Sequence, residues 1–164
     1  MSTKFLHGAD DIIAKVLEVR LHGTNPAPWE AYFPNTGSTL PTTTWPIFSG
    51  GEPGNPDNVI TVYETTPQSN AKIMVTGEDQ QHYGFTIRVR GRTKAEARQK
   101  AEDIRHDANE KIRDIVVTLD GQQYLVPCIP RATLVPVGRE TPTSQRWLVN
   151  LNCLAAIIAY PIQG

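Results

Sequence analysis

The segment YGFTIRVRGRTKAEARQKAEDIRHDANEKIR, residues 83–113, decides the fold because it places a strand directly before a long helix. In residues 83–90 apolar and polar side chains alternate, a period of two that is typical of a strand with one buried and one solvated face. The apolar positions are Phe85, Ile87 and Val89. Gly91 then turns the chain, so the segment predicts a strand that packs against the helix after it.

The helix predicted over residues 93–113 has a marked beginning and a narrow apolar stripe. Thr93 and Glu96 form a capping box, in which each side chain satisfies a free backbone N–H of the first turn. The stripe consists of Ala97, Ala101, Ile104, Ala108 and Ile112. Because three of these five are alanine, the helix can lie close to a sheet, and its charged side faces solvent.

The rest of the chain adds one helix and several strands. Residues 10–22 show apolar spacings of three and four behind Asp10 and Asp11, which predicts an amphipathic helix. Strands are expected at residues 59–63, 115–119, 123–127 and 132–137, and from Trp147 onward, with an Asp120–Gly121 turn making a hairpin. Residues 1–164 therefore read as one α+β domain, with two helices packed on one face of a mostly antiparallel sheet.

Residues 24–57 do not fit that pattern and are expected to form a long loop. Seven of the 13 prolines lie there, and prolines at this density prevent a sustained helix or central strand. The loop also holds five aromatic residues, which are Trp29, Tyr32, Phe33, Trp45 and Phe48. Two interpretations stay open: the rings cover the domain's own core, or they form a surface for a partner, where Trp and Tyr dominate binding.

Charge is balanced in total but not along the chain. The 16 Lys and Arg against 17 Asp and Glu give a net charge of −1, which excludes a protein that coats DNA through non-specific phosphate contacts. Residues 21–71 contain no Lys or Arg and four acids, a local charge of −4. Residues 72–146 contain 13 basic and 10 acidic residues, a local charge of +3. The sequence thus predicts an acidic and a basic section.

Four basic residues occur within seven positions, namely Arg88, Arg90, Arg92 and Lys94. Arg88 and Arg90 fall on the same side of the predicted strand. The group is interpreted as a solvated strand face, as a surface for an acidic protein partner, or as a contact for nucleic acid. No aromatic residues are interleaved with the basic ones, which weakens the interpretation as a single-strand platform.

Motifs that would indicate catalysis or a cofactor are missing from the sequence. The four histidines lie in four separate segments without metal-ligand spacing and are expected to be exposed. Cys128 and Cys153 are expected to be free thiols. No phosphate-binding loop and no G-x-S-x-G turn occurs. No signal peptide or membrane span is expected, which predicts an intracellular domain. Because the motifs named above are missing, neither enzymatic activity nor a cofactor is expected.

Several of these segments together resemble a known family. They are NPDNVITVYE at residues 55–64, the strand 83–90 with Arg90-Gly91 and the charged helix behind it, the strand around Tyr124, and RWLVN at residues 146–150. This arrangement is similar to the tail terminator (minor capsid, tail completion) proteins of long-tailed bacteriophages. The resemblance covers residues 8–22 and 55–154 and does not account for the loop at residues 24–57.

The resemblance implies a structural role. Members of this family form a ring, typically of six subunits, on the head-proximal end of the tail tube. The ring ends tube polymerisation and presents a surface to the head-completion or stopper protein, and DNA later passes through it. The resemblance implies no enzymatic activity and no cofactor. It implies a location in the virion tail or neck after assembly in the bacterial host cytoplasm. A different head-tail connector or stopper remains an alternative, and a nucleic-acid-binding module is a further one.

Two hypotheses connect the charges to such a ring. In the first, the acidic section of one subunit meets the basic residues 88–94 or the following helix of its neighbour, with the loop aromatics as anchors, since a ring joins two different patches. In the second, Arg88 or Arg90 lines the lumen and faces DNA. Residues 155–164 carry no charge and are expected to form a C-terminal arm, and the sequence leaves open whether this arm docks on a neighbouring subunit.

Overall fold

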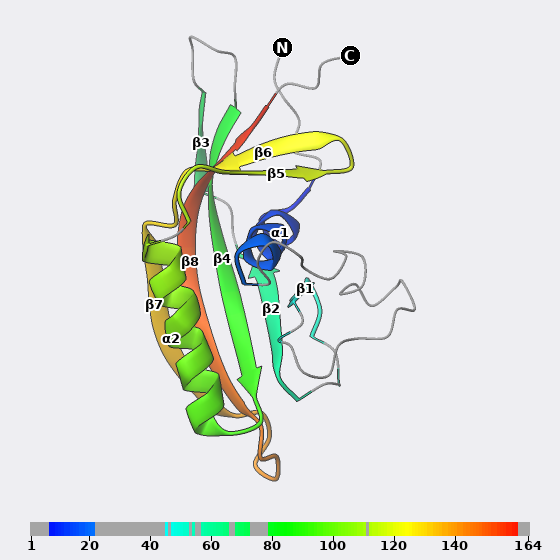
Figure 1. Ribbon diagram of the computed structural model, residues 1–164, viewed down its shortest axis with the longest axis vertical. Coiled ribbons are helices and arrows are strands. Elements are labelled where there is room, and N and C mark those ends of the chain that lie inside the picture. Colours follow the sequence, from blue (N-terminus) through cyan, green and yellow to red (C-terminus); the bar gives the residue numbers. More distant parts are fainter. Residues whose placement is uncertain are drawn as a thin grey trace.

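Two long strands, β4 (Asp79–Gly91) and β8 (Trp147–Ala159), pair antiparallel over their full length at the centre of the sheet (Figure 1). The computed structural model describes residues 7–21, 45, 47–52, 54, 57–65, 68–72, 79–110 and 112–160. The other elements are α1 (Ala9–Leu21), β1 (Ile47–Ser49), β2 (Val59–Glu64), β3 (Gln68–Lys72), α2 (Lys94–Glu110), β5 (Ile115–Leu119), β6 (Gln122–Val126) and β7 (Arg131–Arg139).

The described strands form one mixed sheet in the order β1-β2-β4-β8-β6-β5, with β3 paired to β4 and β7 paired to β8. All pairs are antiparallel except β1 with β2, which is parallel. The predicted α+β class is therefore confirmed. The predicted Asp120–Gly121 turn is confirmed too, because both residues have positive φ (49° and 81°), as a tight hairpin turn requires.

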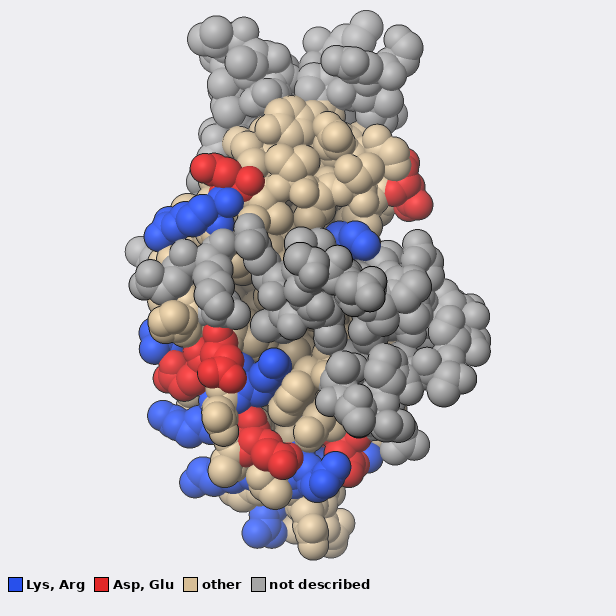
Figure 2. Space-filling model, in the orientation of Figure 1, with Lys and Arg blue, Asp and Glu red and all other residues tan. Residues whose placement is uncertain are grey.

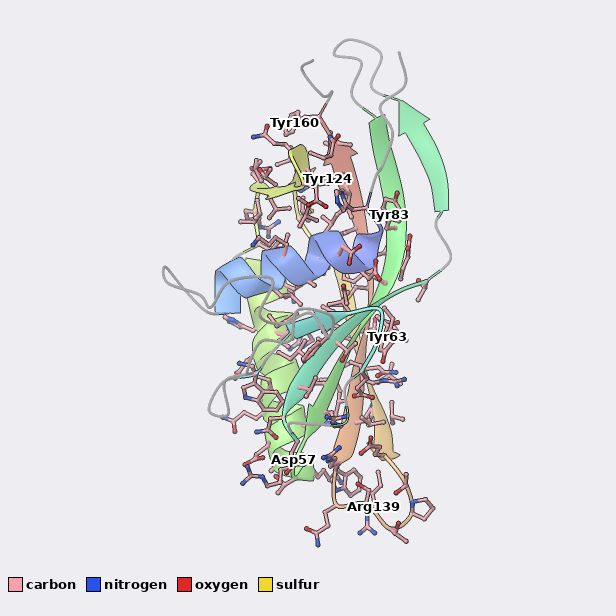
Figure 3. All side chains as sticks on the ribbon, turned by 90° about the vertical axis from the view of Figure 1, so that its right-hand side faces the viewer. Asp57, Tyr63, Tyr83, Tyr124, Arg139 and Tyr160 are labelled. Carbon is pink, nitrogen blue, oxygen red and sulfur yellow. The ribbon has the colours of Figure 1, made fainter. Side chains whose placement is uncertain are left out.

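The core lies between the sheet and the helices. Both helices contribute buried apolar residues to the same cluster as the inner face of β4, where Tyr83, Phe85, Ile87 and Val89 are at most 5% exposed. Figures 1 and 3 show α1 and α2 on the same side of the sheet, with α1 crossing the strands and α2 running along them. The alternation in residues 83–90 thus determines which sheet face is covered.

The junction between β4 and α2 is tight. A Cβ atom built at Gly91 would lie 2.7 Å from the backbone N of Ala97 and 2.9 Å from its Cα. The predicted capping contact is present, since the backbone N–H of Glu96 donates to Thr93 Oγ1 at 3.2 Å. Only a glycine lets the strand end approach the first turn of the helix this closely, because any larger residue would push the two backbones apart.

Three expectations need correction. The segment at residues 24–57 is not wholly a loop, because Ile47–Ser49 forms β1 at the edge of the sheet, where few backbone donors are needed. Residues 155–159 are no arm: they continue β8, with Ala155, Ile157 and Ala159 at 0% exposure. Finally, β7 is longer than the predicted residues 132–137. It pairs with β8 from Arg131 to Arg139 and accommodates Pro136 at a register shift.

Candidate functional site

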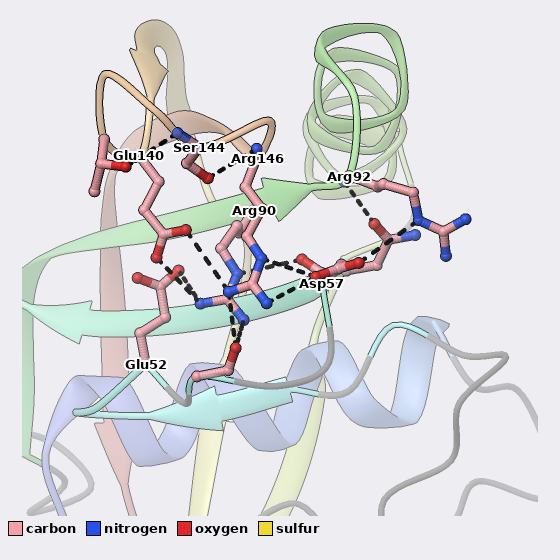
Figure 4. A network of polar contacts seen from close by, with 10 residues as sticks. Glu52, Asp57, Arg90, Arg92, Glu140, Ser144 and Arg146 are labelled. Carbon is pink, nitrogen blue, oxygen red and sulfur yellow. Dashed lines mark hydrogen bonds and ion pairs between the residues drawn. The ribbon is translucent and has the colours of Figure 1, made fainter.

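The end of β4 nearest α2 carries a cluster of charged side chains from four separate parts of the chain (Figure 4). Arg146, just before β8, donates from Nε to Asp57 Oδ1 at 2.8 Å and from Nη1 to the Gly54 carbonyl oxygen at 2.7 Å. Its Nη2 also lies 2.7 Å from Asp57 Oδ1. Two guanidinium nitrogens on one carboxylate give the short, directional pairing that arginine forms best.

Arg90 is the centre of this cluster and is 1% exposed. Its Nε donates to the Asp57 carbonyl oxygen at 3.2 Å, and its Nη2 donates to that of Gly54 at 3.4 Å. Its Nη1 lies 3.7 Å from carboxylate oxygens of both Glu52 and Glu140. The buried charge is therefore surrounded by acceptors, as a buried guanidinium must be. We call Glu52, Asp57, Arg90, Glu140 and Arg146 the arginine cluster.

Opposing effects act on the pKa of Arg90. Burial lowers it most, because the charged form loses hydration, and the nearby charge of Arg146 lowers it further. Glu52, Glu140 and Asp57 raise it by stabilising the positive charge. Arginine stays protonated throughout the physiological range, so the cluster acts as a fixed electrostatic contact and not as a proton donor. Its effect is to join Glu52 and Asp57 to the β7–β8 turn through the end of β4.

The sheet face opposite the helices presents a second polar arrangement. Arg88 Nε donates to Asn150 Oδ1 across the β4–β8 pair at 3.1 Å, and the Arg88 guanidinium lies 5.3 Å from the centre of the Tyr63 ring. One step along the strands, Thr86 Oγ1 donates to Asn152 Oδ1 at 3.2 Å. These side chains form a polar ladder on one face of the sheet.

The structure separates the four predicted basic residues. Arg88 lies on the polar ladder, Arg90 is buried, and Arg92 and Lys94 are exposed at the start of α2. The idea that Arg90 contributes to an exposed interface or a lumen is wrong, because its side chain is enclosed by the chain's own carboxylates and carbonyls. Alternation placed Arg90 correctly on the face of Arg88, but at this end of that face Glu52, Gly54 and Asp57 contact its guanidinium.

The predicted aromatic surface is only partly visible. Trp29, Tyr32 and Phe33 lie outside the described residues. Trp45 is partly buried against the core, with Lys100 Nζ 5.7 Å from its ring centre. Phe48 is 1% exposed, so it stabilises the fold and is not available to a partner. For these last two rings the structure therefore supports the interpretation that they cover the domain itself.

The acidic section is likewise used within the subunit. Of its four acids, Glu52 and Asp57 belong to the arginine cluster, and Glu30 lies outside the described residues. Only Glu64 is described as an exposed acid of this section. A section with a charge of −4 along the sequence thus offers much less negative surface in the folded chain.

One polar contact was not predicted from the sequence, because the histidines were expected to be exposed and nothing connected His7 with its two partners. His7 Nε2 lies 3.0 Å from Asp120 Oδ2, and His7 Nδ1 lies 2.8 Å from the Tyr124 hydroxyl. Since a carboxylate only accepts, Nε2 carries the proton and Nδ1 accepts from the tyrosine. The contact holds the residues before α1 against the β5–β6 hairpin. Sequence spacing gives no signal for it, because more than 110 residues separate the partners.

Among the described residues, no three or more His, Cys, Asp or Glu side chains converge in a way that would hold a metal ion. None of the described helices combines the length and the apolar character needed to cross a membrane.

Comparison with known proteins gives similarities to solved structures, but no family model and no curated protein matches the sequence. Among solved structures, the chain is similar to a chain of the "Virion of native gene transfer agent (GTA) particle". The TM-score is 0.40 and the sequence identity 14%, over 68% of this chain and 78% of that chain. A similarity of this degree carries no conclusion about the function or the partners of the protein.

Proposed function

We propose that the protein is a structural component of a phage-like virion, and specifically a tail terminator. In this role its copies form a ring of six subunits, as in that family, which caps the head-proximal end of the tail tube, stops tube growth and offers a surface to the head-completion or stopper protein. DNA passes through the ring only transiently. The role is structural and needs neither a catalytic residue nor a cofactor.

The observation that carries the proposal is how the segments behind the family resemblance are placed. They lie on β2, β4, β8 and β6, which are successive neighbours in the sheet. Three of them meet in one contact, because Asp57, Arg90 and Arg146 belong to the arginine cluster. Segments scattered over residues 55–150 thus form one connected unit in space, as we expect if this chain shares the architecture of the tail terminator family.

The fold suits a ring subunit for mechanical reasons. β4 and β8 are hydrogen-bonded over 13 residues each, and the arginine cluster fixes the loops at one end of this pair. A rigid sheet can present an unchanging surface to a neighbour, which reduces the entropy lost on association. The polar ladder around Arg88 and Asn150 is a candidate for that surface or for the wall of the channel.

The first experiment is native mass spectrometry with negative-stain imaging of the purified chain, alone and with polymerising tube protein from the same particle. We expect closed rings and tubes whose growth stops when the chain is added. Rings that bind the head-completion protein but leave tube growth unchanged would instead identify another connector or stopper. A chain that forms no ring under either condition and leaves tube lengths unchanged would contradict both roles.

A variant can test the polar ladder in the same assay. Arg88→Glu replaces the positively charged donor to Asn150 with a negatively charged acceptor and should reduce ring formation or tube capping. Arg98→Glu, an exposed change of the same kind on α2, is the matched control. Arg90→Glu is unsuitable here, because it would place a third carboxylate beside Glu52 and Glu140 and disturb the fold. Equal capping by the two variants would exclude the ladder from the assembly surface.

A further inference from the structure

A polar hollow lies at the end of the molecule where the β7–β8 turn meets the start of α2. Its volume is about 450 Å³, and its lining includes Arg92, Lys94, Arg139 and Trp147. Figure 3 shows Arg139 at this end of the elongated sheet. The hollow is separate from the arginine cluster, whose five residues do not line it. We call it the basic hollow.

The cations of the basic hollow are held in place but not neutralised. Lys94 Nζ lies 5.4 Å and Arg139 Cζ 5.7 Å from the centre of the Trp147 ring, so one indole positions both. Neither contacts a carboxylate among the described residues. Arg92 has only a long contact, with its Nε 3.7 Å from Asp57 Oδ2, and its side chain is 66% exposed. Apart from this Arg92–Asp57 contact, the cations of the basic hollow have no acidic partner among the described residues.

Hydroxyl groups add hydrogen-bond donors to these charges. Thr93 Oγ1 and Ser144 Oγ line the hollow, and each accepts a backbone N–H, from Glu96 and from Arg146. A hydroxyl that accepts from the backbone still has its own hydrogen to donate. Cations together with such donors are the chemistry that binds an oxyanion.

A carboxylate fits this site better than the backbone of DNA. Binding to DNA requires a basic surface that follows several phosphates, whereas the basic hollow is small and one of its cations, Arg92, already contacts Asp57. Figure 2 shows Lys and Arg interspersed with Asp and Glu over the lower half of the face drawn there, so that face has no extended basic stripe. A compact acidic group of a protein is the ligand that matches a small basic site of this kind.

The chain itself carries such an acidic group, at the other flank of the sheet. Asp10 and Glu64 converge on Gly8: a Cβ atom there would lie 2.5 Å from Asp10 Oδ1 and 2.7 Å from Glu64 Oε2. The pKa of Asp10 is raised by burial and then by the charges of Asp11 and Glu64. Neither Asp10 nor Glu64 contacts a cation among the described residues, so a cation from outside would relieve their repulsion.

The two sites cannot meet within one subunit. Glu64 on β2 pairs with Phe85 on β4, whereas the basic hollow lies next to Gly91, further along β4, which pairs with Trp147 on β8. Six residues of strand separate these positions, which is about 20 Å. They also lie on opposite sides of β4, one toward β2 and the other toward β8 and β7. Two complementary patches on opposite flanks are what a head-to-tail interface between identical subunits needs.

We infer that the basic hollow of one subunit receives the Asp10–Glu64 carboxylates of a second copy of the chain. This inference rests on the proposed ring and names the contact that joins its subunits. It replaces the broader expectation that the whole acidic section meets residues 88–94, because Glu52 and Asp57 are already paired and Arg90 is buried.

The test uses two charge-reversal variants, one of the basic hollow and one of the acidic site, whose association defects should compensate each other in a mixture. Lys94→Glu with Arg139→Glu reverses the basic hollow, and the new acid at the first turn of α2 is favourable for the helix. Glu64→Lys reverses the exposed member of the acidic site. In analytical ultracentrifugation at low salt, we expect each variant alone to associate about tenfold more weakly than the wild type. A 1:1 mixture should recover wild-type association, because each hollow then meets a site of opposite charge.

Arg98→Glu and Asp103→Lys, two exposed reversals on α2, are the matched controls and should leave association unchanged. Circular dichroism checks that every variant is folded. A mixture that associates no better than the single variants would overturn the inference while wild-type rings uphold the proposed function. A hollow variant that keeps full association but loses binding to a short DNA duplex would also overturn it, in favour of a phosphate ligand. A wild-type chain that stays monomeric alone and with tube protein would overturn both proposals.

Discussion

Arg146 and Asp57 are 89 residues apart in sequence, yet Arg146 Nε donates to Asp57 Oδ1 at 2.8 Å. This contact joins the residues before β2 to the residues before β8, two strands that do not pair with each other. With Arg90 between them, it holds the residues just before β2 and the β7–β8 turn against the end of β4. The arginine cluster is thus a tertiary contact at one end of the central strand pair of the sheet.

Removing the acid of this pair should destabilise the fold moderately. Asp57→Ala deletes an acceptor used by two Arg146 nitrogens, and charge-assisted hydrogen bonds contribute about 1.5–3 kcal/mol when shielded. Because the Asp57 side chain is 42% exposed, we expect a loss of about 1 kcal/mol in the free energy of unfolding. Urea denaturation measures it, and Asp57→Asn, which keeps one oxygen acceptor, should lose less. Identical midpoints for wild type and Asp57→Ala would contradict a stabilising role.

Arg90 should matter more, because its charge is enclosed. Arg90→Ala leaves Glu52 and Glu140 facing each other without their shared cation, and breaking a buried pair in this way costs about 3–5 kcal/mol. Arg90→Lys keeps the charge but loses the planar fork that reaches two carbonyls, so we expect an intermediate loss. Arg88→Ala, on the same strand but only half-buried, is the control and should cost less than either. Comparable losses at positions 88 and 90 would mean that burial of Arg90 is not decisive.

Gly91→Ala tests the tight junction between β4 and α2. The new methyl group would meet the Ala97 backbone at less than 3 Å, and neither backbone can move without disturbing the strand or the helix cap. Overpacking of this kind costs about 1–3 kcal/mol. Gly51→Ala is a matched control, since a Cβ there has nothing within 4 Å. Thermal unfolding of the two variants should show a lowered midpoint for Gly91→Ala alone.

The raised pKa of Asp10 predicts a specific pH dependence. Burial and the charges of Asp11 and Glu64 raise this pKa, so the folded chain binds the proton more tightly than the unfolded chain. The free energy of unfolding therefore falls as pH rises from the unfolded value, about 4, through the raised folded value. Asp10→Asn removes this contribution, and its stability should fall less than that of the wild type over that interval.

Urea midpoints of both proteins between pH 3 and pH 7 provide the measurement, and the difference between the two curves isolates Asp10 from other titrating groups. Asp103→Asn, on the exposed side of α2, serves as the control and should run parallel to the wild type. Parallel curves for Asp10→Asn as well would contradict the raised pKa.

Local patterns predicted most of the elements but not all of their lengths. The alternation in residues 83–90 and the spacing of Ala97, Ala101 and Ile104 depend on neighbours along the chain, so both elements could be recognised directly. β4 extends upstream to Asp79 and β8 runs on to Ala159, because each is paired with the other throughout. Residues without a strand pattern of their own can be held in a strand by a long partner.

The candidate functional residues show the same difference between what local sequence patterns predict and what tertiary contacts decide. The sequence by itself determined the α+β class, the covered face of the sheet, the hairpin turn and the segments that resemble a tail terminator. Only the tertiary structure decided that Arg90 is buried while Arg88 is not, that Phe48 belongs to the fold, and that Glu52 and Asp57 are already paired. It also placed Lys94 and Arg139 around Trp147. These outcomes depend on contacts between residues far apart in sequence, and such contacts are set by strand register and loop path, on which local periodicity carries no information.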